Sequence, residues 1–155
     1  MIDKIDAKIL EIIQQDAQIS KLALAARVGL TKTAVFTRVR KLEEAGVIQT
    51  YQAHVNPQSV ARGMAAFIFV RANEPYGSQQ TGKALARIPE VLEVHNIAGE
   101  DCYLVKVRVA DTDALGKLLR EKFGKLKTIQ STRTTIALDT LKESTVLPVS
   151  ERNEA

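Results

Sequence analysis

The sequence is poor in the features that mark secreted, membrane-spanning or disulfide-bonded proteins. It has one cysteine, Cys102, among 155 residues, which excludes an intramolecular disulfide and is typical of a reducing compartment. No apolar run approaches the roughly 20 residues that a membrane-spanning helix needs. The opening residues MIDKIDAKIL carry acids among their apolar side chains, which does not fit a secretory signal. Together these absences predict a cytoplasmic protein without membrane contact.

Motifs of catalysis and of metal binding are also missing. The sequence contains no phosphate-binding loop, nucleophile elbow or dinucleotide fingerprint. Its two histidines, His54 and His95, are far apart and belong to no cluster with metal-ligand spacing. Cys102 fits a small buried apolar residue better than a redox sensor. We therefore expect no enzymatic activity, no metal and no cofactor.

Positive charge is present, and it is concentrated in one segment. The whole chain has a net charge of only +4, yet residues 17–42 hold six basic side chains and no acidic one. A local cluster of this kind favours a binding site for a polyanion over a generally basic surface. The six residues are Lys21, Arg27, Lys32, Arg38, Arg40 and Lys41.

The same part of the chain predicts three short helices. Asp3, Ser20 and Thr31 are good N-cap residues, and each precedes an apolar repeat with helical spacing. Gly29 and Gly46 stand where the second and third helices would end. The turn between these two helices is therefore tight.

The apolar residues of these helices indicate which sides face a core. We expect Leu22, Ala25 and Ala26 to face inward from the second helix, residues 21–27, and Val35, Val39 and Leu42 from the third. Residues 47–51 are typical of a short strand. Three helices with a tight turn, followed by a β-ribbon, describe a winged helix-turn-helix.

The third helix turns its polar side away from that core, so it would enter the major groove of double-stranded DNA. We expect its basic residues to contact mainly phosphates, and Thr33 and Thr37 to lie nearer base edges. The predicted DNA-binding residues are Lys21, Thr31, Lys32, Thr33, Thr37, Arg38, Arg40 and Lys41.

The second half of the chain predicts an α+β domain. Strands are expected at residues 65–70, 91–97, 102–110 and 128–138, and helices at 77–87 and 111–123. The order βαββαβ is the ferredoxin-like motif. Its helices would cover one face of the sheet, and the other, partly apolar face suggests association with further copies.

These patterns divide the chain into four segments. We expect a winged helix-turn-helix domain at 1–55, a linker at 56–63, a ferredoxin-like domain at 64–140 and a tail at 141–155. The polar tail would be loose or would lie on a neighbouring copy.

Four segments in succession are specific enough to identify a resemblance. They are IDAKILEIIQQDAQIS, LAARVGLTKTAVFTRVRKLEEAGVIQTYQAHVNP, AGEDCYLVKVRVAD and QSTRTTIAL. In this order and spacing the sequence resembles the Lrp/AsnC family of transcription regulators over nearly its whole length. The resemblance implies an N-terminal helix-turn-helix and a C-terminal effector and assembly domain. It also implies homodimers that assemble further, often to octamers, and an amino acid as effector.

The resemblance also implies an effector site. Gly99, Glu100 and Tyr103 match the family's effector loop, whereas Asp101 and Cys102 depart from it. From the residues alone, Gly99 predicts a hairpin turn with positive φ. The implied effector-binding residues are Gly99, Glu100, Asp101, Tyr103, Thr132 and Thr134.

Two alternative functions remain open from the residues alone. In the first, the chain is a ferredoxin-like effector-binding or amino-acid-metabolism protein, and its basic helix serves only packing; residues 64–139 show no catalytic constellation. In the second, aromatic residues on the sheet bind RNA, although Phe67, Phe69 and Tyr103 lack the basic aromatic motif of such sheets.

Overall fold

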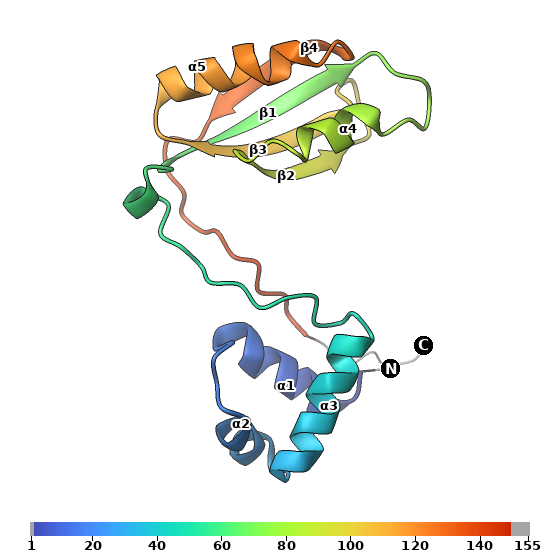
Figure 1. Cartoon of the computed structure of the whole chain (residues 1–155), viewed down its shortest axis with the longest axis vertical. Helices are drawn as coiled ribbons and strands as arrows, with labels where there is room; N and C mark the ends of the chain where they lie inside the picture. Colours follow the sequence, from blue (N-terminus) through green and yellow to red (C-terminus); the bar gives the residue numbers. More distant parts are fainter. Residues whose placement is uncertain (1, 150–155) are drawn as a thin grey trace. The chain divides into compact units, whose positions relative to one another are not determined.

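The structure, a computed structural model, describes residues 2–149 and divides into two compact units (Figure 1). Among the described residues, the first unit contains residues 2–54 together with 143–149. The second unit contains residues 55–142. Each unit has its own apolar core. No helix among residues 2–149 combines the length and the apolar character that crossing a membrane would require.

The first unit is built on three helices, α1 (Lys4–Gln15), α2 (Lys21–Val28) and α3 (Lys32–Glu44). All three predicted N-caps are confirmed. The Asp3 carboxylate accepts the backbone N–H groups of Ile5 and Asp6 at 2.9 and 2.8 Å, and Asp6 returns the bond to complete a capping box. These caps satisfy N–H groups that a helix start otherwise leaves without a partner.

The core of the first unit lies between the three helices. Val35, Val39 and Leu42 are buried there, as the stripe on the third helix predicts. The prediction for the second helix is wrong in part, since Leu22 is 69% exposed and Ala26 is exposed as well. Ala25 is buried as predicted, and Leu24 and Val28 pack inward in place of Leu22 and Ala26. Because α2 is apolar on almost every side, its sequence period could not select the buried face.

The strand predicted at residues 47–51 is absent. The backbone N–H groups of Val47 and Ile48 both donate to the carbonyl of Leu42, at 2.9 and 3.1 Å, and thereby close the end of α3. The Tyr51 hydroxyl donates to the Glu43 carboxylate at 2.8 Å. Burial, followed by this hydrogen bond, raises the pKa of Tyr51 to about 12. The described part of the first unit has no other strand, so this segment has no partner for a β ladder.

Residues 143–149, from the segment predicted as a tail, lie on the first unit of the same chain. The side-chain amide of Gln14 accepts the Leu147 N–H at 2.8 Å and donates to the Leu147 carbonyl at 3.0 Å. Val149 packs against the core of the three helices. Residues 150–155 of the predicted tail are outside the described residues.

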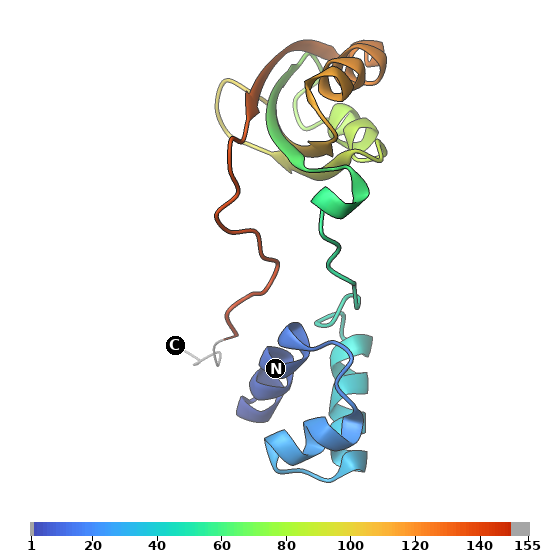
Figure 2. The same cartoon turned by 90° about the vertical axis from the view of Figure 1, so that its left-hand side faces the viewer.

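The second unit has the ferredoxin-like βαββαβ order, which confirms the predicted fold class. Its elements are β1 (Met64–Ala72), α4 (Gln80–Leu85), β2 (Val91–Asn96), β3 (Tyr103–Val109), α5 (Thr112–Glu121) and β4 (Ile129–Ile136). The antiparallel sheet has the strand order β2-β3-β1-β4. Figure 2 shows α4 and α5 together on one face of the curved sheet.

The two faces of this sheet differ in character. On the helix-covered face, Tyr103, Val105, Val107 and Val109 are all buried, because every second side chain of a strand points to the same face. The other face carries a mixture of apolar and charged side chains. It includes Phe67, Phe69, Leu104, Lys106 and Arg133.

The segment predicted as a linker is attached to the end of β3. Gln58–Val60 form a short 3-10 turn, and the Arg108 guanidinium donates to the carbonyls of Arg62 and Gly63 at 3.3 and 3.2 Å. This segment therefore belongs to the second unit.

Candidate nucleic-acid interface and ligand site

A connection of three residues fixes α3 against α2. The Ser20 hydroxyl accepts the Ala23 N–H at 3.1 Å at the start of α2. Gly29 ends α2 at φ 71°, in the left-handed region that glycine adopts without strain. Thr31 then caps α3 by accepting the Ala34 N–H at 3.2 Å. This is the geometry of a helix-turn-helix.

The second helix of that motif exposes one continuous polar and basic face. Its exposed residues before Leu42 are Lys32, Thr33, Phe36, Thr37, Arg40 and Lys41. Thr31 and Lys21 are exposed at the starts of α3 and α2. A helix kept only for packing would bury this face, so the exposure speaks against that alternative.

The cations on this face are available for phosphates. Lys32 and Lys41 form no ion pair with another residue of the described chain. The Nε atom of Arg40 donates to Glu44 at 2.7 Å, but both side chains are more than half exposed. An exposed pair of this kind contributes on the order of 0.5 kcal/mol, so a phosphate can replace Glu44 at little cost.

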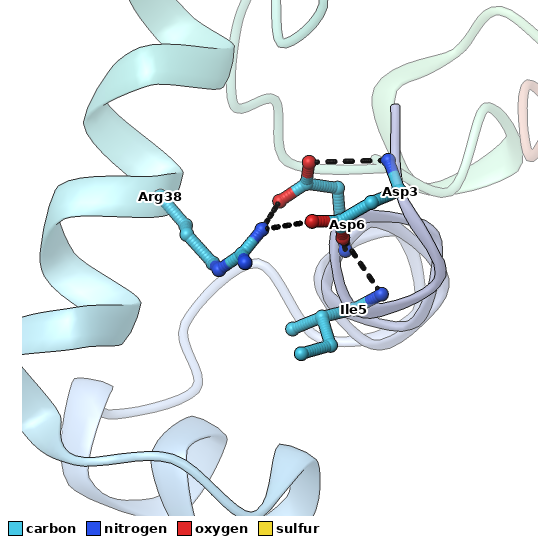
Figure 3. A network of polar contacts seen from close by, with 4 residues as sticks. All are labelled: Asp3, Ile5, Asp6 and Arg38. Atoms are coloured by element: carbon cyan, nitrogen blue, oxygen red, sulfur yellow. Dashed lines mark hydrogen bonds and ion pairs between the residues drawn. The ribbon is translucent and has the colours of Figure 1, made fainter. Parts of the chain in front are cut away.

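Arg38 differs from the other predicted DNA-binding residues. Its guanidinium lies 2.6 Å from Asp3 and 2.8 Å from Asp6, so it joins α3 to the start of α1 (Figure 3). The pKa of Asp3 is lowered by the hydrogen bond from the Asp6 N–H and then by Arg38, while both carboxylates raise the pKa of Arg38. Only about a third of the Arg38 side chain is exposed.

Two further details of α3 affect how it could read bases. The Thr37 hydroxyl donates a hydrogen bond to the carbonyl of Thr33 at 3.0 Å, so it is not available to donate one to a base. Phe36 is 46% exposed, and the Lys21 ammonium lies 4.0 Å from the centre of its ring. The sequence prediction missed Phe36, although its position outside the stripe of Val35 and Val39 was a usable signal.

In the second unit, the β2–β3 hairpin carries three of the predicted effector residues. Gly99 has φ 145°, which confirms its predicted positive φ. Arg71 donates from Nε to the carbonyl of Glu100 at 3.1 Å, and Arg133 donates to the Asp101 carboxylate at 3.1 Å. The hairpin is thus held against the end of β1 and the middle of β4.

Tyr103 is buried, and its hydroxyl donates to the Glu74 carboxylate at 2.6 Å. Glu74 also accepts hydrogen bonds from Ser78 and Thr81, at 3.0 to 3.2 Å. Burial pulls the pKa of Glu74 upward, but these hydrogen bonds outweigh burial and leave the pKa below its ordinary value. Burial, followed by the contact with Glu74, raises the pKa of Tyr103.

The strand register brings the remaining predicted residues to the same end of the sheet. Tyr103 and Thr132 both pair with Val70, from opposite sides, so they lie about 10 Å apart in one row. Thr134 lies two residues further along β4, on the same face as Thr132, and pairs with Ile68. The sequence prediction missed Arg71, Arg133 and Glu74, because only the pairing of distant strands places them here.

The fold and these two regions define a helix-turn-helix nucleic-acid-binding module joined to a ferredoxin-like domain. Two family models match the chain, one described as winged helix-turn-helix DNA-binding at residues 2–49 and one as Lrp/AsnC ligand binding domain at residues 65–147. The leucine-responsive regulatory protein of Escherichia coli K12 is 36% identical over 153 residues, covering 97% of this chain and 93% of that protein.

Solved structures agree with these sequence similarities. A transcriptional regulator from Neisseria meningitidis in complex with L-Met has a TM-score of 0.89 at 28% identity, covering 96% of this chain and 97% of that one. A feast or famine regulatory protein from Mycobacterium tuberculosis complexed with L-methionine has a TM-score of 0.84 at 33% identity, covering 99% of both chains. The chain belongs to the Lrp/AsnC family of DNA-binding transcriptional regulators.

Proposed function

We propose that this regulator binds specific DNA sites through the exposed face of α3 and has no enzymatic activity. The observation that carries the proposal is that face itself, which is polar, basic and held at a fixed angle by the capped turn from α2. A rigid helix of this kind fits the major groove, where side chains distinguish base pairs. We place the protein in the cytoplasm, where such DNA is accessible.

The residues on and beside this face take different roles in the proposal. Lys21, Lys32, Arg40 and Lys41 contact phosphates, and Thr31 supports them at the helix start. Thr33 lies at a base edge, and Thr37 contributes its methyl group and its remaining acceptor capacity there. Arg38 acts as a positioning residue, because its guanidinium is engaged by two carboxylates of α1.

The salt dependence of DNA affinity distinguishes residues that contact phosphates from residues that only position the helix. Each phosphate that a cation neutralises contributes about 0.9 to the slope of log affinity against log salt concentration. We expect Lys41→Ala to lower this slope by about that amount for every DNA sequence. Arg38→Met should weaken binding with an unchanged slope, and Thr33→Ala should alter sequence preference. If Lys41→Ala and Thr33→Ala bind selected and random DNA like the wild type, a different surface reads the DNA.

We further propose that an amino acid binds at the end of the sheet that carries the β2–β3 hairpin. Two relatives of similar fold were solved with L-methionine, which makes amino acids the first ligands to test. Glu100 or Asp101 would meet the ammonium group, backbone N–H groups near Gly99 would meet the carboxylate, and Tyr103, Thr132 and Thr134 would line the site. Calorimetric titration with each of the twenty amino acids tests this proposal. It would be overturned if no amino acid released or absorbed heat of binding and none changed the affinity for DNA.

We also propose that two copies of the chain form a homodimer through the open face of the sheet. The open face of the sheet carries Phe67, Phe69 and Leu104, which a homodimer would bury. The dimer would assemble further to a higher oligomer, an octamer, with the effector between subunits. We expect Phe67→Asp to lower the molar mass measured by light scattering. The control variant Thr112→Asp places the same charge at the exposed start of α5, on the helix-covered side of the sheet, and should leave the molar mass unchanged.

A further inference from the structure

Phe36 is an exposed aromatic residue on a helix face that is otherwise polar. It follows Thr33 by one helical turn and precedes Arg40 by one turn, so the three side chains form one row on α3. Its ring is 46% exposed, whereas the adjacent core residue Val35 is fully buried. Phe36 is therefore not required for the core of the first unit.

The ring also has a cation as its neighbour. The ammonium of Lys21, the first residue of α2, lies 4.0 Å from the ring centre, which is a cation–π contact. A protein surface that covered the ring would also have to desolvate this ammonium. A nucleic-acid duplex instead brings phosphates that neutralise it. The charge beside Phe36 thus favours DNA over a second protein as its partner.

The major groove offers few groups that an apolar ring can contact. Its base edges present hydrogen-bond donors and acceptors, and the C5-methyl of thymine is the apolar group among them. Next to Phe36, the Thr37 hydroxyl already donates a hydrogen bond to the Thr33 carbonyl and cannot donate one to a base. The centre of the face is therefore better suited to apolar contact than its polar composition indicates.

We propose that Phe36 contacts the C5-methyl group of a thymine and so determines an A·T preference at one position of each half-site, while Lys21 holds the adjacent phosphate. This inference rests on the proposed DNA interface and names the base that the interface reads at this point.

A test removes the two contacting groups separately. Sites are first selected from random duplex DNA with the full-length wild-type protein. Each thymine of a selected site is then replaced by deoxyuracil, which lacks only the methyl group. For the wild type we expect a loss of about fourfold in affinity at one thymine per half-site, which corresponds to the ~0.8 kcal/mol of one buried methylene-sized group. Phe36→Ala should show no loss at that thymine, because the contact is already gone.

Two variants serve as controls. Leu22→Ala removes another exposed apolar side chain from the same helix-turn-helix and should keep the full dependence on the methyl group. Phe36→Leu should restore part of that dependence, since leucine remains apolar. Helical content measured by circular dichroism checks that each variant is folded.

The possible outcomes distinguish failure of the thymine contact from failure of the proposed DNA interface. If Phe36→Ala keeps the wild-type loss at every thymine, or if the wild type shows none, the thymine contact is refuted. If Phe36→Ala instead changes only the oligomeric state, the ring packs on a second copy and the inference is again refuted. If the wild type selects no DNA at all, the proposed DNA interface itself fails, and this inference falls with it.

Discussion

Asp3 offers a quantitative test of how the first unit is held together, because its carboxylate has two roles. It caps α1 by accepting the N–H groups of Ile5 and Asp6, and it forms an ion pair with Arg38 on α3. Asp3→Ala removes both roles. Asp3→Ser keeps a capping oxygen but removes the charge, so the two variants separate the cap from the ion pair.

The structure sets the expected magnitudes. Loss of an N-cap costs about 1 kcal/mol. The ion pair is worth on the order of 0.5 kcal/mol, because the Asp3 side chain is 50% exposed and Arg38 keeps its second partner, Asp6. Asp3→Ser should therefore destabilise the first unit by about 0.5 kcal/mol and Asp3→Ala by about 1.5 kcal/mol. In so small a unit the larger value is a substantial part of the total stability.

Amide hydrogen exchange measures these changes, since it reports the opening free energy of each unit separately. In an Arg38→Met background, Asp3→Ser should cost nothing further, whereas Asp3→Ala should still lose the cap. The stabilisation that the ionised Asp3 carboxylate provides, first as the cap and then as the partner of Arg38, should also depend on pH. Because the folded pKa of Asp3 is lowered, its stabilisation is present above the unfolded value of about 3.9 and disappears as the pH falls through the folded value. Equal destabilisation by Asp3→Ser and Asp3→Ala at neutral pH would refute the reasoning.

Three further predictions concern single contacts. Removal of residues 143–155 should destabilise the first unit by about 1–2 kcal/mol in hydrogen exchange and leave the second unit unchanged, since Leu147 bonds to Gln14 and Val149 packs on the core of the first unit. Tyr103→Phe should cost the second unit about 1.5–3 kcal/mol in urea unfolding at neutral pH, because Glu74 loses its shortest hydrogen bond. The difference should shrink in acid, because the lowered pKa of Glu74 makes its stabilisation disappear as the pH falls. Gly82→Ala should lower the thermal midpoint despite its better helix propensity, since the added Cβ would lie 2.6 Å from the Tyr103 ring; Gly116→Ala, which meets only the flexible end of Arg120, is the matched control.

The sequence by itself determined the features that depend on neighbours along the chain. Asp3, Ser20 and Thr31 were identified as caps because each acts on backbone groups two or three residues away. Gly29 was identifiable as a helix end because only its own backbone has to reach the left-handed region. The alternation in β3 gave the buried face because side chains on a strand alternate with a period of two.

Some local patterns were ambiguous even so. The apolar residues of α2 surround the helix, and the position of α1 and α3 selected Leu24 over Leu22 for the core. Residues 47–51 have strand composition, but a strand also needs a partner, and hydrogen bonds to Leu42 and Glu43 hold this segment instead. In both cases a residue's own preference left two outcomes open, and packing decided between them.

Only the tertiary structure decided which distant residues meet. Arg38 counted as one more cation on a basic helix until α1 placed Asp3 and Asp6 beside it. Glu74 became the partner of Tyr103 through the pairing of β1 with β3. Residues 143–149 include apolar side chains that could be buried, but nothing near them in the sequence indicated Gln14 as a partner. The reason is physical: caps and alternation depend on short-range chain geometry, whereas these contacts depend on how separate elements pack and in which register their strands pair.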